Sequence, residues 1–459
     1  MRLKELIAKR ELSCMEVVRS HLDRIATLNP GLNAIVSVDE SRALSDARAI
    51  DQAIAEGKQP GLLAGVPMTV KDLYEVAGIP STSGTRGRTG FIPSVDATVV
   101  ERLRRAGAIV IGKSNVPEFG MCLETTNDVF GTTNNPYDVA RSPGGSSGGA
   151  VASVASGFAA LEIGSDGGGS IRMPCHFCGV AGFKATTHRV SKAGHFPVPT
   201  GIASRLAGYG PIARSILDVA AAFEVILGSD PRDPDALPAS VDVGRVPAMT
   251  GLRVGVFTDN GIRAPSAEIS QAVERCAAIL EGGGARVLEK RPPRMDDAFE
   301  IHLGLLIVDR CLIDDWKAAA GTEVLHAWVQ AGVEYLADAA ADFDANTATM
   351  LHDDWDAYRR DARLFMQDFD VLIGPVAPGA ALPHGELSSA DNYDWCSYAS
   401  LYNVTGWPAA VIRAGTSADG LPIGVQIAGA AFSDRLVLEV AAFLEREIGG
   451  FVPPNLARD

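Results

Sequence analysis

The chain has 459 residues, of which 47% are hydrophobic and 21% charged, and its formal net charge is −15. This composition is typical of a well-buried globular protein, and the negative charge argues against nucleic acid or an anionic membrane as a partner. The chain starts with a short amphipathic helix that lacks the apolar core of a signal peptide, has no long apolar window and carries seven cysteines, which together predict a cytoplasmic protein with free thiols.

The N-terminal part of the chain alternates predicted helices and strands. The helices are expected over residues 2–28 (as two helices), about 41–57 and 96–106, and the strands over residues 65–72 and 108–113. Ser13 and Glu16 form a capping box in the second helix. Lys71 falls at the end of an apolar strand, which favours a buried amine over the usual surface lysine. The alternation predicts a sheet with helices on its faces.

Residues 141–186 are rich in glycine and serine at both ends. An apolar run over residues 150–163, predicted as a helix followed by a strand, separates the two small-residue loops. Loops of this kind let backbone N–H groups and hydroxyls approach a ligand closely. The alternative is a pair of tight turns around a buried helix, and this stretch alone does not decide between them.

The alternation of strands and helices continues from residue 180 onward and is interrupted by a proline- and aspartate-rich surface connection at residues 229–248. Strands are expected over residues 180–184, 252–257, 285–288, 370–375, 408–412 and 424–427, and helices over about 215–227, 265–281 and 433–446. Residues 295–368 are helical in pattern and carry three of the five tryptophans. We expect these tryptophans to pack between helices, with a helical cap over a pocket as the alternative.

Three common chemistries fit the sequence poorly. Neither glycine-rich loop is followed by the Gly-Lys-Ser/Thr of a phosphate-binding loop. Cys175-His176-Phe177-Cys178 is a lone pair of cysteines without a second ligand pair, so no metal site and no cofactor are expected. The eight histidines are scattered, with no Gly-x-Ser-x-Gly elbow before them, and His176 is expected to be structural.

The remaining candidate chemistry is a nucleophilic serine that a lysine activates. Serine is a weak nucleophile until a base takes its proton, and a lysine can be that base only when burial keeps it neutral. Lys71 is the best candidate for the base. The available hydroxyls are those of Ser146, Ser147, Ser165 and Ser170. The glycines just before Ser170 would supply backbone N–H groups to a developing oxyanion.

These residues resemble the amidase signature family of serine hydrolases. Three segments carry the resemblance: Gly65-Val66-Pro67-x-x-x-Lys71-Asp72, Gly144-Gly145-Ser146-Ser147-Gly148-Gly149, and Gly164-Ser165-Asp166-x-Gly168-Gly169-Ser170-Ile171-Arg172. Matches at Asn135-Pro136, Gly210-Pro211 and Gly420-Leu421-Pro422-x-Gly424-x-Gln426 extend it along most of the chain. Residues 290–400 are the least family-like part.

The resemblance implies a role for each matched residue. Ser170 would be the acyl nucleophile, Ser146 the bridging serine after a cis peptide bond, and Lys71 the neutral base. The oxyanion hole would comprise the N–H groups of Gly167, Gly168, Gly169 and Ser170. Ser147, Asp166 and Arg172 would support the site, and Gly120 and Met121 would border the acyl pocket, where Cys122 departs from the family's usual small residue.

The implied fold is a single α/β domain over residues 1–459, an α/β/α sandwich around a large mixed sheet, with a cap-like helical segment at about 295–368. The implied activity is hydrolysis of a small-molecule amide, with aryl acylamides or carbamates (urethanes) as candidate substrates. We expect a monomer or homodimer. The alternatives are the glutaminase subunit of a tRNA-dependent amidotransferase, which would need a partner subunit, and a non-catalytic binding protein on the same fold.

Overall fold

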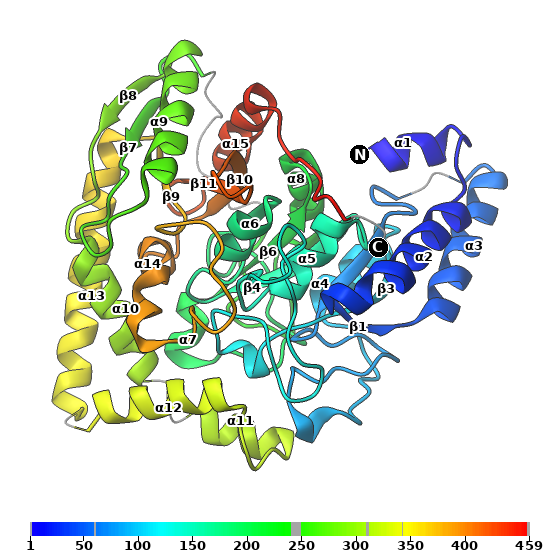
Figure 1. Ribbon diagram of the computed structural model, residues 1–459, viewed down its shortest axis with the longest axis horizontal. Coiled ribbons are helices and arrows are strands. Elements are labelled where there is room, and N and C mark those ends of the chain that lie inside the picture. Colours follow the sequence, from blue (N-terminus) through cyan, green and yellow to red (C-terminus); the bar gives the residue numbers. More distant parts are fainter. Residues whose placement is uncertain (1, 59–60, 240–248, 309–311, 342, 457–459) are drawn as a thin grey trace.

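A mixed sheet of eleven strands forms the centre of the computed structural model, which describes residues 2–58, 61–239, 249–308, 312–341 and 343–456 (Figure 1). Its order is β1-β3-β2-β4-β6-β5-β10-β11-β9-β7-β8. The strands are β1 (Ile35–Val38), β2 (Pro67–Lys71), β3 (Ile109–Ser114), β4 (Leu161–Asp166), β5 (Ala181–Lys184), β6 (Gly208–Ala213), β7 (Arg253–Val256), β8 (Arg286–Glu289), β9 (Val371–Pro375), β10 (Ala409–Thr416) and β11 (Pro422–Ala428). Strand β2 lies parallel to both β3 and β4, whereas β4, β6, β5, β10, β11 and β9 pair antiparallel in turn.

Helices cover both faces of the sheet (Figure 1). The helices are α1 (Arg2–Ala8), α2 (Cys14–Leu32), α3 (Glu40–Ala55), α4 (Thr98–Arg105), α5 (Gly148–Ser156), α6 (Arg172–Cys178), α7 (Gly201–Leu206), α8 (Ile216–Ile226), α9 (Ala267–Gly282), α10 (Met295–Val308), α11 (Leu312–Ala320), α12 (Ala327–Ala339), α13 (Ala345–Phe365), α14 (Ser397–Val404) and α15 (Asp434–Ile448). Successive strand residues point to opposite faces. In β10, Ala410 and Ile412 join the core beneath α4, α8, α9 and α15, whereas Val411 joins the core beneath α5 and α6.

The fold class expected from the sequence, an α/β/α arrangement around a large mixed sheet, is confirmed. Ser13 accepts a hydrogen bond from the backbone N–H of Glu16 and completes the expected capping box at the start of α2. The expected surface connection at 229–248 lies partly outside the described residues. In the described ranges, no helix is both long and apolar enough to cross a membrane.

The helical pattern of residues 295–368 is also observed, as α10 to α13. Trp355 on α13 is buried and donates from its indole N–H to the carbonyl of Val404, so it packs between helices as expected. Trp316 on α11 instead packs against Phe119, with ring centroids 6.3 Å apart. In Figure 1, α11 and α12 lie along the lower edge of the molecule.

The sequence analysis missed β6, the strand between β4 and β5. Gly210 and Pro211 disguise it, because both residues are poor strand formers in general. The structure explains the glycine: a Cβ at Gly210 would lie 1.8 Å from the carbonyl oxygen of Phe183 on the neighbouring strand. The missing side chain therefore lets β6 lie close to β5.

We predict that Gly210→Ala destabilises the protein by about 1–3 kcal/mol, because the added methyl has to displace backbone of the adjacent strand. The matched control is Gly282→Ala at the end of α9, where a Cβ would meet nothing within 4 Å. That substitution should be neutral or stabilise by up to about 1 kcal/mol, since alanine is a better helix former than glycine. Thermal or urea unfolding of both variants measures the difference, and equal midpoints would contradict the packing argument.

Candidate active site

Lys71 lies at the end of β2, a strand whose residues are all buried between β3 and β4. Its side chain has no exposed surface. The Nζ lies 2.7 Å from Ser146 Oγ, 2.9 Å from Ser147 Oγ and 3.1 Å from Ser165 Oγ. It also lies 3.2 Å from the carbonyl oxygen of Ser165. The structure thus brings the predicted base together with the predicted bridging serine and with Ser147.

Burial lowers the pKa of Lys71 to about 7, although the nearby carboxylates of Asp166 and Glu162 oppose the shift. Removing an ammonium from water penalises its charged form, and no carboxylate among the described residues forms an ion pair with this amine. A large fraction of the lysine is therefore neutral near pH 7. A neutral amine has a lone pair, which can accept a proton from the Ser146 hydroxyl.

A second buried lysine prevents Asp72, the next residue in the chain, from pairing with Lys71. Lys113 on β3 donates to the Asp72 carboxylate at 2.8 Å, and both side chains are almost fully buried. Lys113 also donates to the carbonyl of Tyr74 and to Ser81 Oγ. The two lysines therefore have separate functions: Lys113 neutralises the carboxylate, and Lys71 is left to titrate.

The first serine loop, residues 144–149, packs so tightly that there is no room for a side chain at its glycine positions. A Cβ at Gly145 would lie 2.7 Å from the carbonyl oxygen of Cys122, and one at Gly149 would lie 2.4 Å from backbone atoms of Asn115. The peptide bond between Gly145 and Ser146 is cis. Helix α5 starts at Gly148, within this loop, and all of its residues are buried on the way to β4.

The second loop follows β4 and is organised by Asp166. Arg172 donates to its carboxylate with two nitrogens, at 2.9 and 3.0 Å, and both side chains are fully buried. The backbone N–H groups of Gly169 and Ile171 donate to the same carboxylate at 2.8 and 3.1 Å. Burial by itself would raise the pKa of Asp166, but Arg172 and these hydrogen bonds hold it well below its ordinary value. Asp166 is thus a charged anchor for the loop.

The hydrogen bond of Gly169 changes the expected oxyanion hole. Its N–H is bound to Asp166 and is not available to a substrate. In the described part of the chain, the N–H groups of Gly167, Gly168 and Ser170 have no hydrogen-bond partner. These three are the donors that an oxyanion can reach, so the structure differs from the sequence-based expectation at Gly169.

Ser170 is partly exposed, unlike the buried Lys71 and Ser146. The backbone N–H of Ser147 donates to the Ser170 carbonyl at 3.2 Å, which holds the two loops together. The Ser170 hydroxyl makes no hydrogen bond to the described groups. The contact between Ser146 and Ser170 that a proton relay needs is therefore implied by the resemblance and is not among the hydrogen bonds of this structure.

The chain is similar to known proteins over most of its length. Residues 16–438 match the family described as Amidase. The chain belongs to the amidase signature family. It is an amidase, an enzyme that acts on carbon–nitrogen bonds.

Three relatives illustrate the range of the family. The A-subunit of glutamyl-tRNA(Gln) amidotransferase from Acidothermus cellulolyticus is 36% identical, over 96% of this chain and 93% of its own length. The solved structure of 6-aminohexanoate cyclic dimer hydrolase is 28% identical, covers 97% of this chain and 95% of its own, and has a TM-score of 0.85. A bacterial aryl acylamidase structure is also 28% identical, with coverage of 96% and 94% and a TM-score of 0.82.

Gly120, one of the two predicted acyl-pocket residues, lies beside Ser146, the predicted bridging serine. A Cβ at Gly120 would lie 3.5 Å from Ser146 Oγ and 2.8 Å from Leu73. Phe119 and Met121 join an apolar cluster with residues of α11 and α12. The members of this cluster are Phe119, Met121, Cys122, Phe196, Ile313, Trp316, Ala320, Leu325, Val329 and Val333. An apolar surface to which the helical segment contributes therefore lies next to Gly120 and close to the predicted bridging serine.

Two buried histidines near the serine loops were missed by the sequence analysis. His195 Nε2 lies 3.1 Å from Ser165 Oγ, which itself lies 3.1 Å from Lys71 Nζ. Burial lowers the pKa of His195 to about 3, so its imidazole is neutral. Its Nδ1 carries the hydrogen and donates to the Pro197 carbonyl at 2.6 Å, so Nε2 is left to accept a hydrogen bond from the Ser165 hydroxyl. The other is His302 on α10, which contacts Gly167.

His176 is structural, as expected. Its ring is buried on α6, where Nε2 lies 2.9 Å from the Gly379 carbonyl and Nδ1 accepts the N–H of Gly424. Cys175 and Cys178 beside it are buried free thiols. Within the described ranges, no group of three or more His, Cys, Asp or Glu side chains could hold a metal ion.

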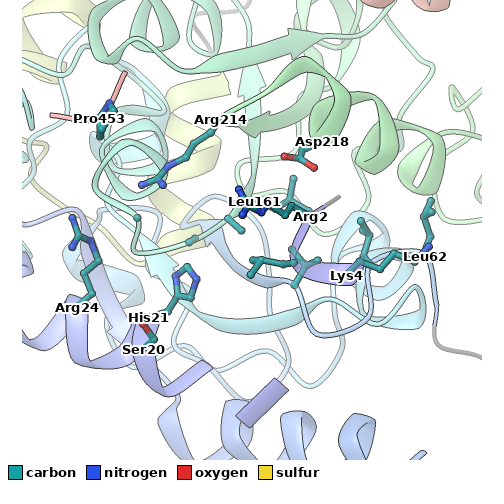
Figure 2. Close-up of a pocket in the computed structure, with 16 residues that line it drawn as sticks. Arg2, Lys4, Ser20, His21, Arg24, Leu62, Leu161, Arg214, Asp218 and Pro453 are labelled. Carbon is teal, nitrogen blue, oxygen red and sulfur yellow. The ribbon is translucent and has the colours of Figure 1, made fainter. Parts of the chain in front are cut away.

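A separate cavity of about 580 Å³ lies at the far end of α5 (Figure 2). Its lining includes the polar side chains of Arg2, Lys4, Ser20, His21, Arg24, Arg214 and Asp218. Ser20 and His21 are adjacent on α2, so they project about 100° apart. His21 Nδ1 contacts the Phe158 carbonyl, and Asp218 accepts from Ser215. These three residues therefore do not form a catalytic triad.

Two of these arginines cap the C-terminal end of α5. Arg214 donates to the carbonyls of Val154 and Ala155 at 2.9 and 3.2 Å, and Arg24 donates to the carbonyl of Ser156. The last carbonyls of a helix have no partner within the helix, and the helix dipole favours positive side chains at this end. The helix that follows the catalytic serine loop is thus fixed at its far end.

We predict that kcat/KM for an amide rises with pH through the range around pH 7 and reaches a plateau above it. The direction of this pH dependence follows from the protonation state of Lys71. Below its pKa, Lys71 is protonated and cannot accept a proton, so kcat/KM should fall about tenfold per pH unit. Glu162→Gln should move this limb to lower pH, because the Glu162 carboxylate raises the pKa of Lys71. An amide pH profile that is flat between pH 5 and 9 would exclude Lys71 as the base.

Proposed function

We propose that this amidase hydrolyses amides through an acyl-enzyme on Ser170, with Lys71 as base and Ser146 as the proton bridge. The observation that carries the proposal is the 2.7 Å contact between Ser146 and a buried Lys71 amine whose pKa is lowered to about 7. Lys71 takes the proton of Ser146, and Ser146 takes that of Ser170. The Ser170 oxygen then forms a bond to the substrate carbonyl carbon.

The negative charge that develops on the carbonyl oxygen is stabilised by backbone N–H groups of the second loop. Gly167, Gly168 and Ser170 carry the donors that lack a partner in the described part of the chain. The proton held by Lys71 returns through Ser146 to the nitrogen as the C–N bond breaks, because an amide anion is too basic to leave unprotonated. A water molecule then gives a proton through Ser146 to Lys71 as its oxygen bonds to the acyl carbon. The bond between that carbon and Ser170 Oγ breaks, Ser170 takes the proton back through Ser146, and the acid leaves.

Two substrate classes have support. The apolar cluster around Phe119 and Trp316 favours a free-standing amide or carbamate hydrolase whose substrate carries an apolar or aromatic group. The sequence comparison favours the glutaminase alternative more strongly, because the relatives at 34–36% identity over nearly the whole chain are named as A-subunits of glutamyl-tRNA(Gln) amidotransferases. That activity would need partner subunits. A non-catalytic role has the least support, since Lys71, Ser146 and Ser170 are all present.

We expect Ser170→Ala to lower hydrolysis of both amides and p-nitrophenyl esters at least about 10³-fold while the fold is retained, because both reactions need the nucleophile. Lys71→Ala should reduce amide hydrolysis far more than ester hydrolysis, since p-nitrophenolate leaves without a proton. Steady-state rates with both substrates, together with circular dichroism, provide the measurement. Undiminished turnover by Ser170→Ala would overturn the mechanism, and equal losses for Lys71→Ala would remove Lys71 from the relay.

A substrate panel separates the two classes. Anilides, primary amides, aryl carbamates and glutamine should be tested on the purified chain alone. A free-standing hydrolase would turn over anilides or carbamates with a kcat/KM at least about tenfold above that for glutamine. A glutaminase subunit would show the opposite order, with glutamine hydrolysis rising when the partner chains that co-purify with it are added back. Phe119→Ala should weaken only the apolar substrates if the Phe119 cluster binds them.

A further inference from the structure

His302 on α10 contacts the second loop at its most exposed part. Its Nε2 lies 2.9 Å from the carbonyl oxygen of Gly167, and its Nδ1 lies 2.9 Å from Ser400 Oγ on α14. The imidazole packs so closely on the loop that a Cβ at Gly168 would lie 2.8 Å from its Cε1. The residue itself is only 2% exposed. His302 is thus a buried side chain that reaches the loop from another part of the fold.

The partners of the ring fix its tautomer. A carbonyl oxygen can only accept, so Nε2 carries the hydrogen and donates it to Gly167. Burial lowers the pKa of His302 to about 4, which keeps the imidazole neutral at ordinary pH. Its Nδ1 is then an acceptor for the hydroxyl of Ser400. Ser400 therefore orients the ring, and the ring holds the Gly167 carbonyl.

Holding this carbonyl also fixes an N–H group. The peptide bond between Gly167 and Gly168 is trans, so its C=O and its N–H point in opposite directions. A hydrogen bond that fixes the Gly167 carbonyl toward α10 directs the Gly168 N–H away from α10. That N–H is one of the three donors in the loop that have no partner among the described residues.

The other two donors are held by the same principle. Asn403 on α14 donates to the Asp166 carbonyl at 3.0 Å and so fixes the peptide that carries the Gly167 N–H. The N–H of Met173 donates to the Gly169 carbonyl at 2.8 Å and so fixes the peptide that carries the Ser170 N–H. Each of these three N–H groups thus belongs to a peptide whose carbonyl is held from the other side. Glycine peptides rotate easily, so a loop of this composition needs such restraints.

We propose that His302 is a positioning residue that sets the oxyanion-binding direction of the Gly168 N–H through its hydrogen bond to the Gly167 carbonyl. The inference rests on the proposed function, in which the loop stabilises the oxyanion formed by Ser170. Preorganised donors lower the barrier because they need not reorient as charge develops. His302 therefore contributes to stabilisation of the tetrahedral intermediate and little to binding of the ground-state amide.

The test compares His302→Leu with His302→Gln, using the best substrate of the panel and the trifluoromethyl ketone that carries the same acyl group. The ketone adds Ser170 Oγ at its carbonyl carbon, the displaced π electrons form the alkoxide, and the Ser170 proton passes through Ser146 to Lys71. His302→Leu should lower kcat about 10- to 100-fold and raise the ketone Ki by a similar factor, with KM changed less than about threefold. His302→Gln keeps an N–H donor and should recover most of the loss.

His176→Leu is the matched control, because His176, like His302, is a buried histidine with both ring nitrogens hydrogen-bonded, but its partners are Gly379 and Gly424 and it does not contact this loop. It should lower the melting temperature without changing kcat per folded enzyme or the ketone Ki. If His302→Leu does not fold, Ser400→Ala tests the proposal in its place. Loss of the partner that orients the ring should raise the ketone Ki about 3- to 10-fold while KM for the substrate is unchanged.

The outcomes separate the two proposals. If Ser170→Ala retains amide hydrolysis, the proposed function fails and the inference with it. If Ser170→Ala is inactive but His302→Leu, or Ser400→Ala in its place, keeps the wild-type kcat and Ki, only the role of His302 is overturned. A His302→Gln variant as impaired as His302→Leu would also contradict the hydrogen-bond argument.

Discussion

The proposed chemistry depends on one amine that is buried and has no ionic partner among the residues that the structure describes. Lys71 lies near Asp72, Glu162 and Asp166, and any of them would hold its charge if it paired with it. Each carboxylate is bound elsewhere: Asp72 by Lys113, Asp166 by Arg172, and Glu162 by Thr69. Burial raises the pKa of Glu162 to about 7, so part of its charge is lost as well. Lys71 is therefore surrounded by acidic residues and still has a lowered pKa.

The segment at residues 290–400, which the sequence alone predicts to be the least family-like, contributes to the site in two ways. Helix α10 supplies His302, and α14, which starts within this segment, supplies Ser400 and Asn403; all three act on the loop that follows β4. Helices α11 and α12 supply the apolar cluster next to Gly120. The first set stabilises the geometry that the chemistry needs, whereas the second forms a surface that a substrate group can contact. A divergent segment can thus change substrate preference while it still supports the same reaction.

The sequence predicted those parts of the site that depend on local pattern. Lys71 could be placed at the end of a buried strand because the apolar run before it is contiguous, and the serine loops could be found because glycine and serine cluster there. His302 could not be found in this way. It is one of eight histidines, and its partners Gly167 and Ser400 lie 135 residues before it and 98 residues after it. Strand β6 was missed for a related reason, because Gly210 is required by its neighbour Phe183 and not by its own strand.

The hydrogen bond that excludes Gly169 from the expected oxyanion hole could not be predicted from the sequence either. A Gly-Gly-Gly run indicates that backbone N–H groups can approach a ligand, but it does not indicate which of them an adjacent carboxylate uses. Asp166 takes the N–H of Gly169 because Arg172 holds that carboxylate over the loop. A motif therefore identifies the loop, whereas the direction of each N–H depends on side chains that come from elsewhere in the fold.

The arginine caps at the far end of α5 have a mechanical consequence. The helix is anchored at one end by the packed glycines around Ser146 and at the other by Arg24 from α2 and Arg214 from the segment after β6 (Figure 2). A helix that is held at both ends cannot shift along its axis. Helix α2 and the strand that precedes Arg214 therefore act as a remote support for Ser146, so the position of this serine depends on contacts a full helix length away.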